Sequence, residues 1–84
     1  MIKFQKVFLE FLAFTTEANY DYVYLYDGYN ASDHRIVRLS GSYTGALPGP
    51  YKSTQPYMFV WFTTDYSNFY TGFEARYTST YGYY

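Results

Sequence analysis

The stretch from Tyr20 to Gly28 constrains the fold of this chain more than any other, because its residues alternate at every position. One face carries Asp21, Val23, Leu25 and Asp27, and the other carries Tyr20, Tyr22, Tyr24 and Tyr26. A period of two is typical of a β-strand with one buried face, and the Asp-Gly pair that ends the stretch predicts a turn. Glu17 precedes this strand, and Asp21 takes its first inward position. Two carboxylates at one strand end indicate a site rather than an apolar core.

The composition of the chain favours strands over helices. Aromatic residues make up 27% of it, with 14 Tyr and 8 Phe, and such residues fit a pleated surface better than a helix. A length of 84 residues allows one domain at most. We therefore predict a single all-β domain over residues 1–84.

Charge and residue usage exclude several classes of function. The formal net charge is -1, so no basic face is expected for nucleic acid or a membrane surface, and no run approaches the roughly 20 apolar residues of a membrane span. The chain has no cysteine, which rules out disulfides. With His34 as its one histidine, it also lacks a ligand set for zinc. No triad or phosphate-binding loop has its usual context, and we expect no enzymatic activity.

Four further segments are predicted to be strands. Residues 1–14 begin like a secretory signal, with Lys3 and Lys6 before an apolar run, but Glu10 interrupts that run and no cleavage site follows. We predict a strand there, and further strands over 36–39, 57–63 and 72–78, with a frayed tail over 79–84. Residues 42–56 are punctuated by Gly and Pro, which predicts a loop. Five strands joined by loops favour an antiparallel β-sandwich.

Three carboxylates lie at the ends of predicted strands, and we expect them to gather at one end of the sandwich, in an acidic rim. Glu17 and Asp21 flank the start of the second strand, and Asp65 follows the fourth. Gathered together, these groups repel one another unless a cation lies between them, and calcium accepts such oxygen ligands, with Asn68 as a further one. The spacing alone leaves two alternatives open: solvated carboxylates that cap turns, or the acid and base of a glycosidase.

Two other surface features carry alternatives of their own. Asn30-Ala31-Ser32 is an N-glycosylation sequon in a predicted loop, a triplet that also arises readily by chance. Several aromatic side chains are predicted to face outward: Tyr22, Tyr24, Tyr57, Phe59 and Trp61. They form either a platform for sugar rings or a surface that packs on further strands or on a second copy of the chain. Asn30 is thus a candidate for glycosylation, and carbohydrate binding is an alternative function.

The order of short motifs along the chain resembles the CUB domain, an extracellular jelly-roll sandwich. The matching motifs are V-x-L-x-F-x-x-F-x-T-E at 7–17, Y-D-Y-V-x-x-Y-D-G at 20–28, L-S-G at 39–41, S-T-x-x-x-M-x-V-x-F-x-T-D at 53–65, S-N at 67–68 and G-F-x-A-x-Y at 72–77. They cover about 70 residues in the order of the family.

This resemblance implies a non-catalytic, extracellular or secreted module that binds calcium and a protein partner. In calcium-binding members of the family the ligands fall on four positions of this chain: Glu17, Asp21, Asp65 and Asn68. The resemblance further implies that a Lys or Arg of the partner pairs with this acidic cluster, with Tyr20 and Tyr66 as neighbouring contacts.

The chain departs from the family in two respects. It lacks the disulfides that the family usually carries, and the connection that normally holds one of those cysteines is shortened to residues 18–20. The first strands of the full jelly roll have no counterpart before Met1. We therefore expect a version that lacks the first strands and has open sheet edges, and self-association through those edges is a further alternative function.

Overall fold

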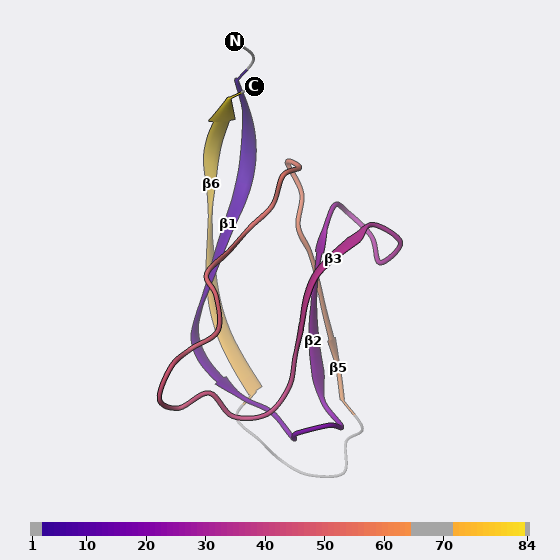
Figure 1. Cartoon of the computed structure of the whole chain (residues 1–84), viewed down its shortest axis with the longest axis vertical. Helices are drawn as coiled ribbons and strands as arrows, with labels where there is room; N and C mark the ends of the chain where they lie inside the picture. The colour runs from indigo at the N-terminus through magenta and orange to yellow at the C-terminus, as the bar shows by residue number, and fades with distance from the viewer. Residues whose placement is uncertain (1–2, 65–71, 84) are drawn as a thin grey trace.

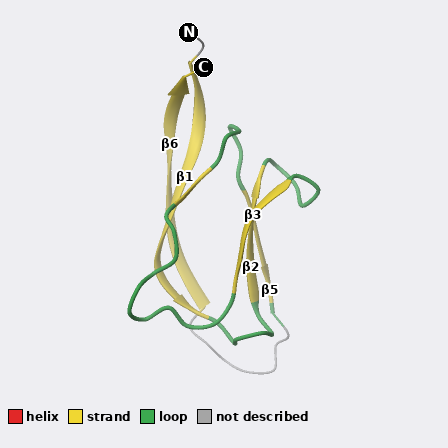
Figure 2. Cartoon of the chain, in the orientation of Figure 1, coloured by secondary structure: helices red, strands yellow, loops and turns green. Residues whose placement is uncertain are grey.

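Strands and loops make up the whole of the described chain. The computed structural model describes residues 3–64 and 72–83, and side chains over 6–64 and 72–79. Six strands are present: β1 (Lys3–Thr15), β2 (Tyr22–Asp27), β3 (His34–Leu39), β4 (Tyr51–Lys52), β5 (Phe59–Thr63) and β6 (Gly72–Tyr83). Figure 2 shows strands joined by loops throughout these ranges. Over the same ranges, no helix has the length and apolar character needed to cross a membrane.

The strands form two antiparallel sheets that face each other (Figure 1). One sheet has the order β4-β1-β6 and the other the order β3-β2-β5. The β1–β6 ladder is the longest, running from the Lys3–Tyr83 pair to the Thr15–Gly72 pair. In Figure 1 this ladder extends beyond the second sheet, and its far end is the pair of Lys3 and Tyr83. The predicted all-β antiparallel sandwich is confirmed.

The core lies between the central strands of the two sheets. Its buried members are Leu9, Phe11 and Phe14 of β1, Val23 and Leu25 of β2, and Leu39 of β3. Full burial of a side chain of this kind contributes about 1.5–3 kcal/mol to stability. The alternation predicted for residues 20–28 therefore places Val23 and Leu25 inside, as the structure shows.

A β-bulge explains why two inward phenylalanines of β1 are three residues apart. The register of β1 against β6 shifts between Phe11 and Ala13, so Leu12 is the extra residue, and its side chain is exposed. A bulge restarts the alternation, which turns Phe14 inward beside Phe11. The two rings meet edge to face, with centroids 5.3 Å apart.

The structure corrects the loop prediction for residues 42–56. Tyr51–Lys52 forms the short strand β4, which pairs with Leu9 and Phe8 of β1. Ser53 anchors it: its backbone N–H donates to the Val7 carbonyl over 2.9 Å, and its Oγ accepts from the Val7 N–H over 2.8 Å. These hydrogen bonds join residues far apart in sequence. They hold residues 51–52 in a strand although the preceding prolines disfavour one.

Candidate functional site

Two of the predicted acidic ligands, Glu17 and Asp21, lie in the tight turn that joins β1 to β2. Both residues are buried, at 8% and 4% exposure. The backbone N–H of Glu17 donates to Asp21 Oδ2 over 3.1 Å. In return, the backbone N–H groups of Tyr20 and Asp21 donate to the Glu17 carbonyl over 3.2 and 2.9 Å. Reciprocal hydrogen bonds therefore fix the two carboxylate-bearing residues at one end of the sandwich.

Ser40 holds this turn from the end of β3. Its hydroxyl donates to the Asp21 carbonyl over 2.7 Å and accepts from the Asn19 N–H over 2.9 Å. Asn19 adopts a φ of 67°, in the left-handed region that Asn tolerates better than most residues. The Ser40 hydroxyl thus connects Asp21, the last residue of the turn, to Asn19, which has the left-handed backbone conformation.

Thr16 and Gly41 form a second connection beneath the turn. The Thr16 N–H donates to the Gly41 carbonyl over 2.9 Å, and the Gly41 N–H donates to Thr16 Oγ1 over 2.9 Å. Sequence reasoning assigned no role to Thr16 or Ser40. Thr16 is part of the T-E pair that ends the motif at 7–17, and Ser40 and Gly41 belong to the L-S-G motif at 39–41. The second motif lies beside the turn only after the chain has folded.

The other predicted ligands, Asp65 and Asn68, and the predicted contact Tyr66 lie outside the described residues. The described residues on either side of that segment have defined neighbours: Thr63 pairs with Tyr22, and Gly72 pairs with Thr15. These are the strand ends that flank the Glu17–Asp21 turn. Residues 3–64 and 72–83 hold no group of three or more His, Cys, Asp or Glu side chains able to bind a metal. The four-residue ligand set stays a prediction.

The chemistry of the described acids suits a hard cation. Carboxylate oxygens are the ligands that calcium prefers, and calcium tolerates irregular geometry. Each ionised carboxylate offers about four acceptor positions, so one carboxylate is able to accept a backbone N–H and bind a cation at the same time. Both acids are buried within one turn, and a bound cation offsets the cost of burying negative charge. The residues therefore fit calcium.

Two other predicted surface residues are accessible. Tyr20 is 62% exposed and immediately precedes Asp21, so a partner that reaches the acidic turn meets this ring. Asn30 is exposed in the loop between β2 and β3, where its Oδ1 accepts a hydrogen bond of 2.9 Å from the Ser32 N–H. Both positions are open to the roles predicted for them, and those roles stay predictions.

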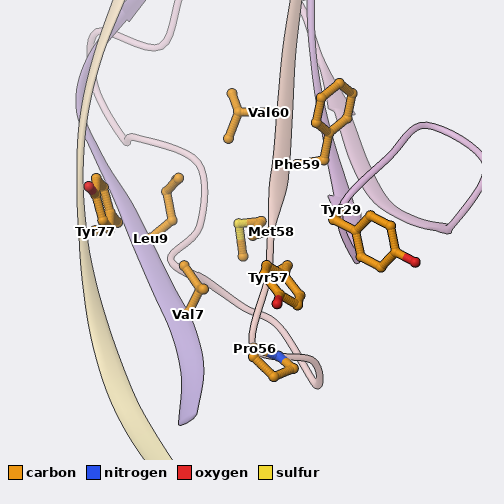
Figure 3. Close-up of a pocket in the computed structure, with 9 residues that line it drawn as sticks. All are labelled: Val7, Leu9, Tyr29, Pro56, Tyr57, Met58, Phe59, Val60 and Tyr77. Atoms are coloured by element: carbon orange, nitrogen blue, oxygen red, sulfur yellow. The ribbon is translucent and has the colours of Figure 1, made fainter.

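An apolar cleft of about 390 Å³ opens between the two sheets beside β5. Figure 3 shows Met58 and Val60 pointing into it toward Leu9 and Val7, with Phe59 on the other side of its strand. Val60 and Phe62, which alternate with the outward Phe59 and Trp61, are 39% and 42% exposed. Among the described residues, β5 is an edge strand that pairs with β2 on one side only. No strand of this described part lies beyond it to cover the inward side chains from the other side. Self-association through this edge stays a prediction.

The chain is similar in sequence to one protein family and to several known proteins. A family model described as the CUB domain matches residues 1–77. Neuropilin-1 of Gallus gallus is 42% identical over 62 residues, which are 73% of this chain and 6% of that protein. Tolloid-like protein 2 of Homo sapiens is 42% identical over 64 residues, which are 76% of this chain and 6% of that protein.

A third relative is matched over nearly the whole chain. CUB and zona pellucida-like domain-containing protein 1 of Homo sapiens is 31% identical over 80 residues, or 95% of this chain and 12% of that protein. The chain thus corresponds to a small part of the length of each of these relatives.

Proposed function

This chain belongs to the CUB domain family, whose members are non-catalytic interaction modules, and on that premise we propose that it is an extracellular, calcium-dependent protein-recognition module. Calcium binds at the rim where β1 passes into β2. A protein partner then docks on that rim. The protein has no catalytic role of its own in this proposal.

The observation that carries the proposal is the pair of buried carboxylates in one turn. Glu17 and Asp21 lie within a single hydrogen-bonded loop, and Ser40 fixes its backbone. Asp65 and Asn68 complete the proposed ligand set, and they belong to the segment between β5 and β6. When bound, calcium neutralises the repulsion between the acids and stabilises the rim.

Partner recognition rests on charge and on one exposed ring. An acidic rim attracts a Lys or Arg side chain, which forms charge-assisted hydrogen bonds with carboxylate oxygens. Tyr20 is 62% exposed next to Asp21 and offers its ring to the aliphatic part of that side chain. Tyr66, next to Asp65 in sequence, is the second proposed contact.

Thermal unfolding with calcium or with a chelator tests the metal site. A ligand that binds only the folded state stabilises it by about 2.7 kcal/mol at 100 times its Kd, and such a gain raises the Tm of a domain this small by about 10 °C or more. We expect Asp65→Ala to abolish the calcium-dependent shift. Glu74→Gln is the matched control, because Glu74 is an exposed carboxylate on β6. Equal melting curves for the wild type in calcium and in chelator would count decisively against the site.

A further inference from the structure

The outer face of the β3-β2-β5 sheet carries two parallel rows of side chains. Cross-strand register aligns Arg38, Tyr24 and Trp61 in one row. It aligns Arg35, Tyr26 and Phe59 in the next. Residues directly opposite each other on neighbouring strands point to the same face. Each row therefore presents a guanidinium at one end and aromatic rings beside it.

The rings in these rows form one continuous surface. The Tyr24 ring lies 5.4 Å from the Trp61 ring and 6.2 Å from the Tyr26 ring, the latter pair stacked at 14°. The Tyr26 and Phe59 rings are 6.0 Å apart. Packing among neighbours leaves Tyr26 only 8% exposed, whereas Trp61 is 44% exposed. The surface is thus preformed and still accessible at Trp61.

Positive charge lines the β3 side of this surface. Arg35 and Arg38 are both exposed, and neither forms an ion pair with a carboxylate of the described residues. The Arg38 guanidinium lies 5.0 Å from the centroid of the Tyr22 ring, at a distance typical of cation–π contact. Two cations beside a flat aromatic surface are complementary to a ligand with both apolar faces and negative groups.

We propose that this face binds an anionic polysaccharide, a linear glycan that bears sulfate or carboxylate groups. The C–H face of a pyranose ring stacks on Tyr24 and Trp61, and its acidic groups accept paired hydrogen bonds from Arg35 and Arg38. The two rows are two residues apart along the strands, or about 6.7 Å, which is of the order of one sugar ring. The site is separate from the calcium rim and needs no metal.

A peptide is a poorer match for this face. Peptides gain affinity by pairing with an open strand edge or by filling pockets. In the described residues the open edges of this sheet belong to β3 and β5, so a peptide paired there would lie beside the aromatic rows and not on the face that carries them. The apolar cleft beside β5 lies on the inner side of the sheet, where Met58 and Val60 point (Figure 3). This face presents exposed ring surface flanked by cations, and a flat anionic glycan is complementary to both.

The fluorescence of Trp61 provides a local test, because the chain contains a single tryptophan. Titration of the 84-residue chain with heparin, in the presence of a calcium chelator, should change the tryptophan emission and saturate. The Arg35→Gln and Arg38→Gln variants should each weaken binding by about tenfold, as expected for loss of a charge-assisted contact. Lys52→Gln removes an exposed cation of β4, on the other sheet, and should leave the affinity unchanged.

Three further arms decide between ligand classes. Hyaluronan, which carries carboxylates alone, should bind more weakly than heparin but lose affinity in the same arginine variants, whereas neutral dextran should not bind. Trp61→Phe should retain heparin binding when measured by calorimetry, and Trp61→Ala should lose it. The proposal is wrong if a single-stranded oligonucleotide of equal charge binds as tightly as heparin, if Lys52→Gln weakens binding as much as Arg38→Gln, or if dextran binds equally well. Failure of the calcium-dependent melting shift alone would leave this result unaffected.

Discussion

Replacing Ser40 with alanine should destabilise the domain by about 1–3 kcal/mol, although Ser40 carries no charge and binds no ligand directly. The change removes the hydroxyl that donates to the Asp21 carbonyl over 2.7 Å and accepts from the Asn19 N–H over 2.9 Å. Each hydrogen bond contributes about 0.5–1.5 kcal/mol net, which gives the stated range for two. The structure therefore assigns a large share of the turn's stability to one hydroxyl.

Urea unfolding followed by circular dichroism, in the presence of chelator, measures this loss without the contribution of a metal. A value of 2 kcal/mol corresponds to a fall in Tm of about 8–16 °C for a domain of this size. Ser42→Ala is the matched control, because Ser42 is exposed two residues further along and forms no hydrogen bond through its side chain among the described residues. Equal stabilities for Ser40→Ala and Ser42→Ala would refute the reasoning that Ser40 fixes the turn.

Three further predictions follow from other parts of the molecule. Burial raises the pKa of Asp27, but hydrogen bonds from Thr54 and Gln55 outweigh it and lower that pKa below its ordinary value. This stabilising effect is present above the unfolded pKa of about 3.9 and is lost as pH falls through the folded pKa, so Asp27→Asn should flatten the acid limb of a stability-against-pH curve. Phe14→Ala should cost about 3–5 kcal/mol by opening a cavity in the core, and urea unfolding should show little folded protein. Asn30→Gln should remove a glycan mass increment when the chain is expressed in a secretory cell, as judged by mass spectrometry, and an unchanged mass would contradict modification at that position.

The strands that could be predicted from sequence are those whose own residues alternate. β2 is the clearest case, because Val23 and Leu25 are fully buried while Tyr22 and Tyr24 face outward. The sequence also predicted that Glu17 and Asp21 would lie at one strand end, since they are four positions apart and β2 begins immediately after Asp21. Local periodicity is sufficient for such features because no distant residue is needed to define them.

The features that could not be predicted depend on contacts between distant segments. β4 exists because Ser53 bonds to Val7, 46 residues away. Arg35 and Arg38 are three residues apart, so a simple period of two would place them on opposite faces. The register shift in β3, at Ile36, instead aligns both with outward tyrosines of β2. A bulge of this kind is set by how two strands pair, and the sequence of one strand does not reveal it.

Calcium titration by calorimetry measures metal binding at the acidic rim itself, without depending on a partner. We expect one calcium site in the wild type, a loss of affinity of at least about tenfold in Glu17→Gln, and an unchanged affinity in Glu74→Gln. Circular dichroism of each variant establishes that it is folded. A folded wild-type chain that gives no heat of binding with calcium, or a Glu17→Gln variant that binds as tightly as the wild type, would contradict a calcium site at this rim.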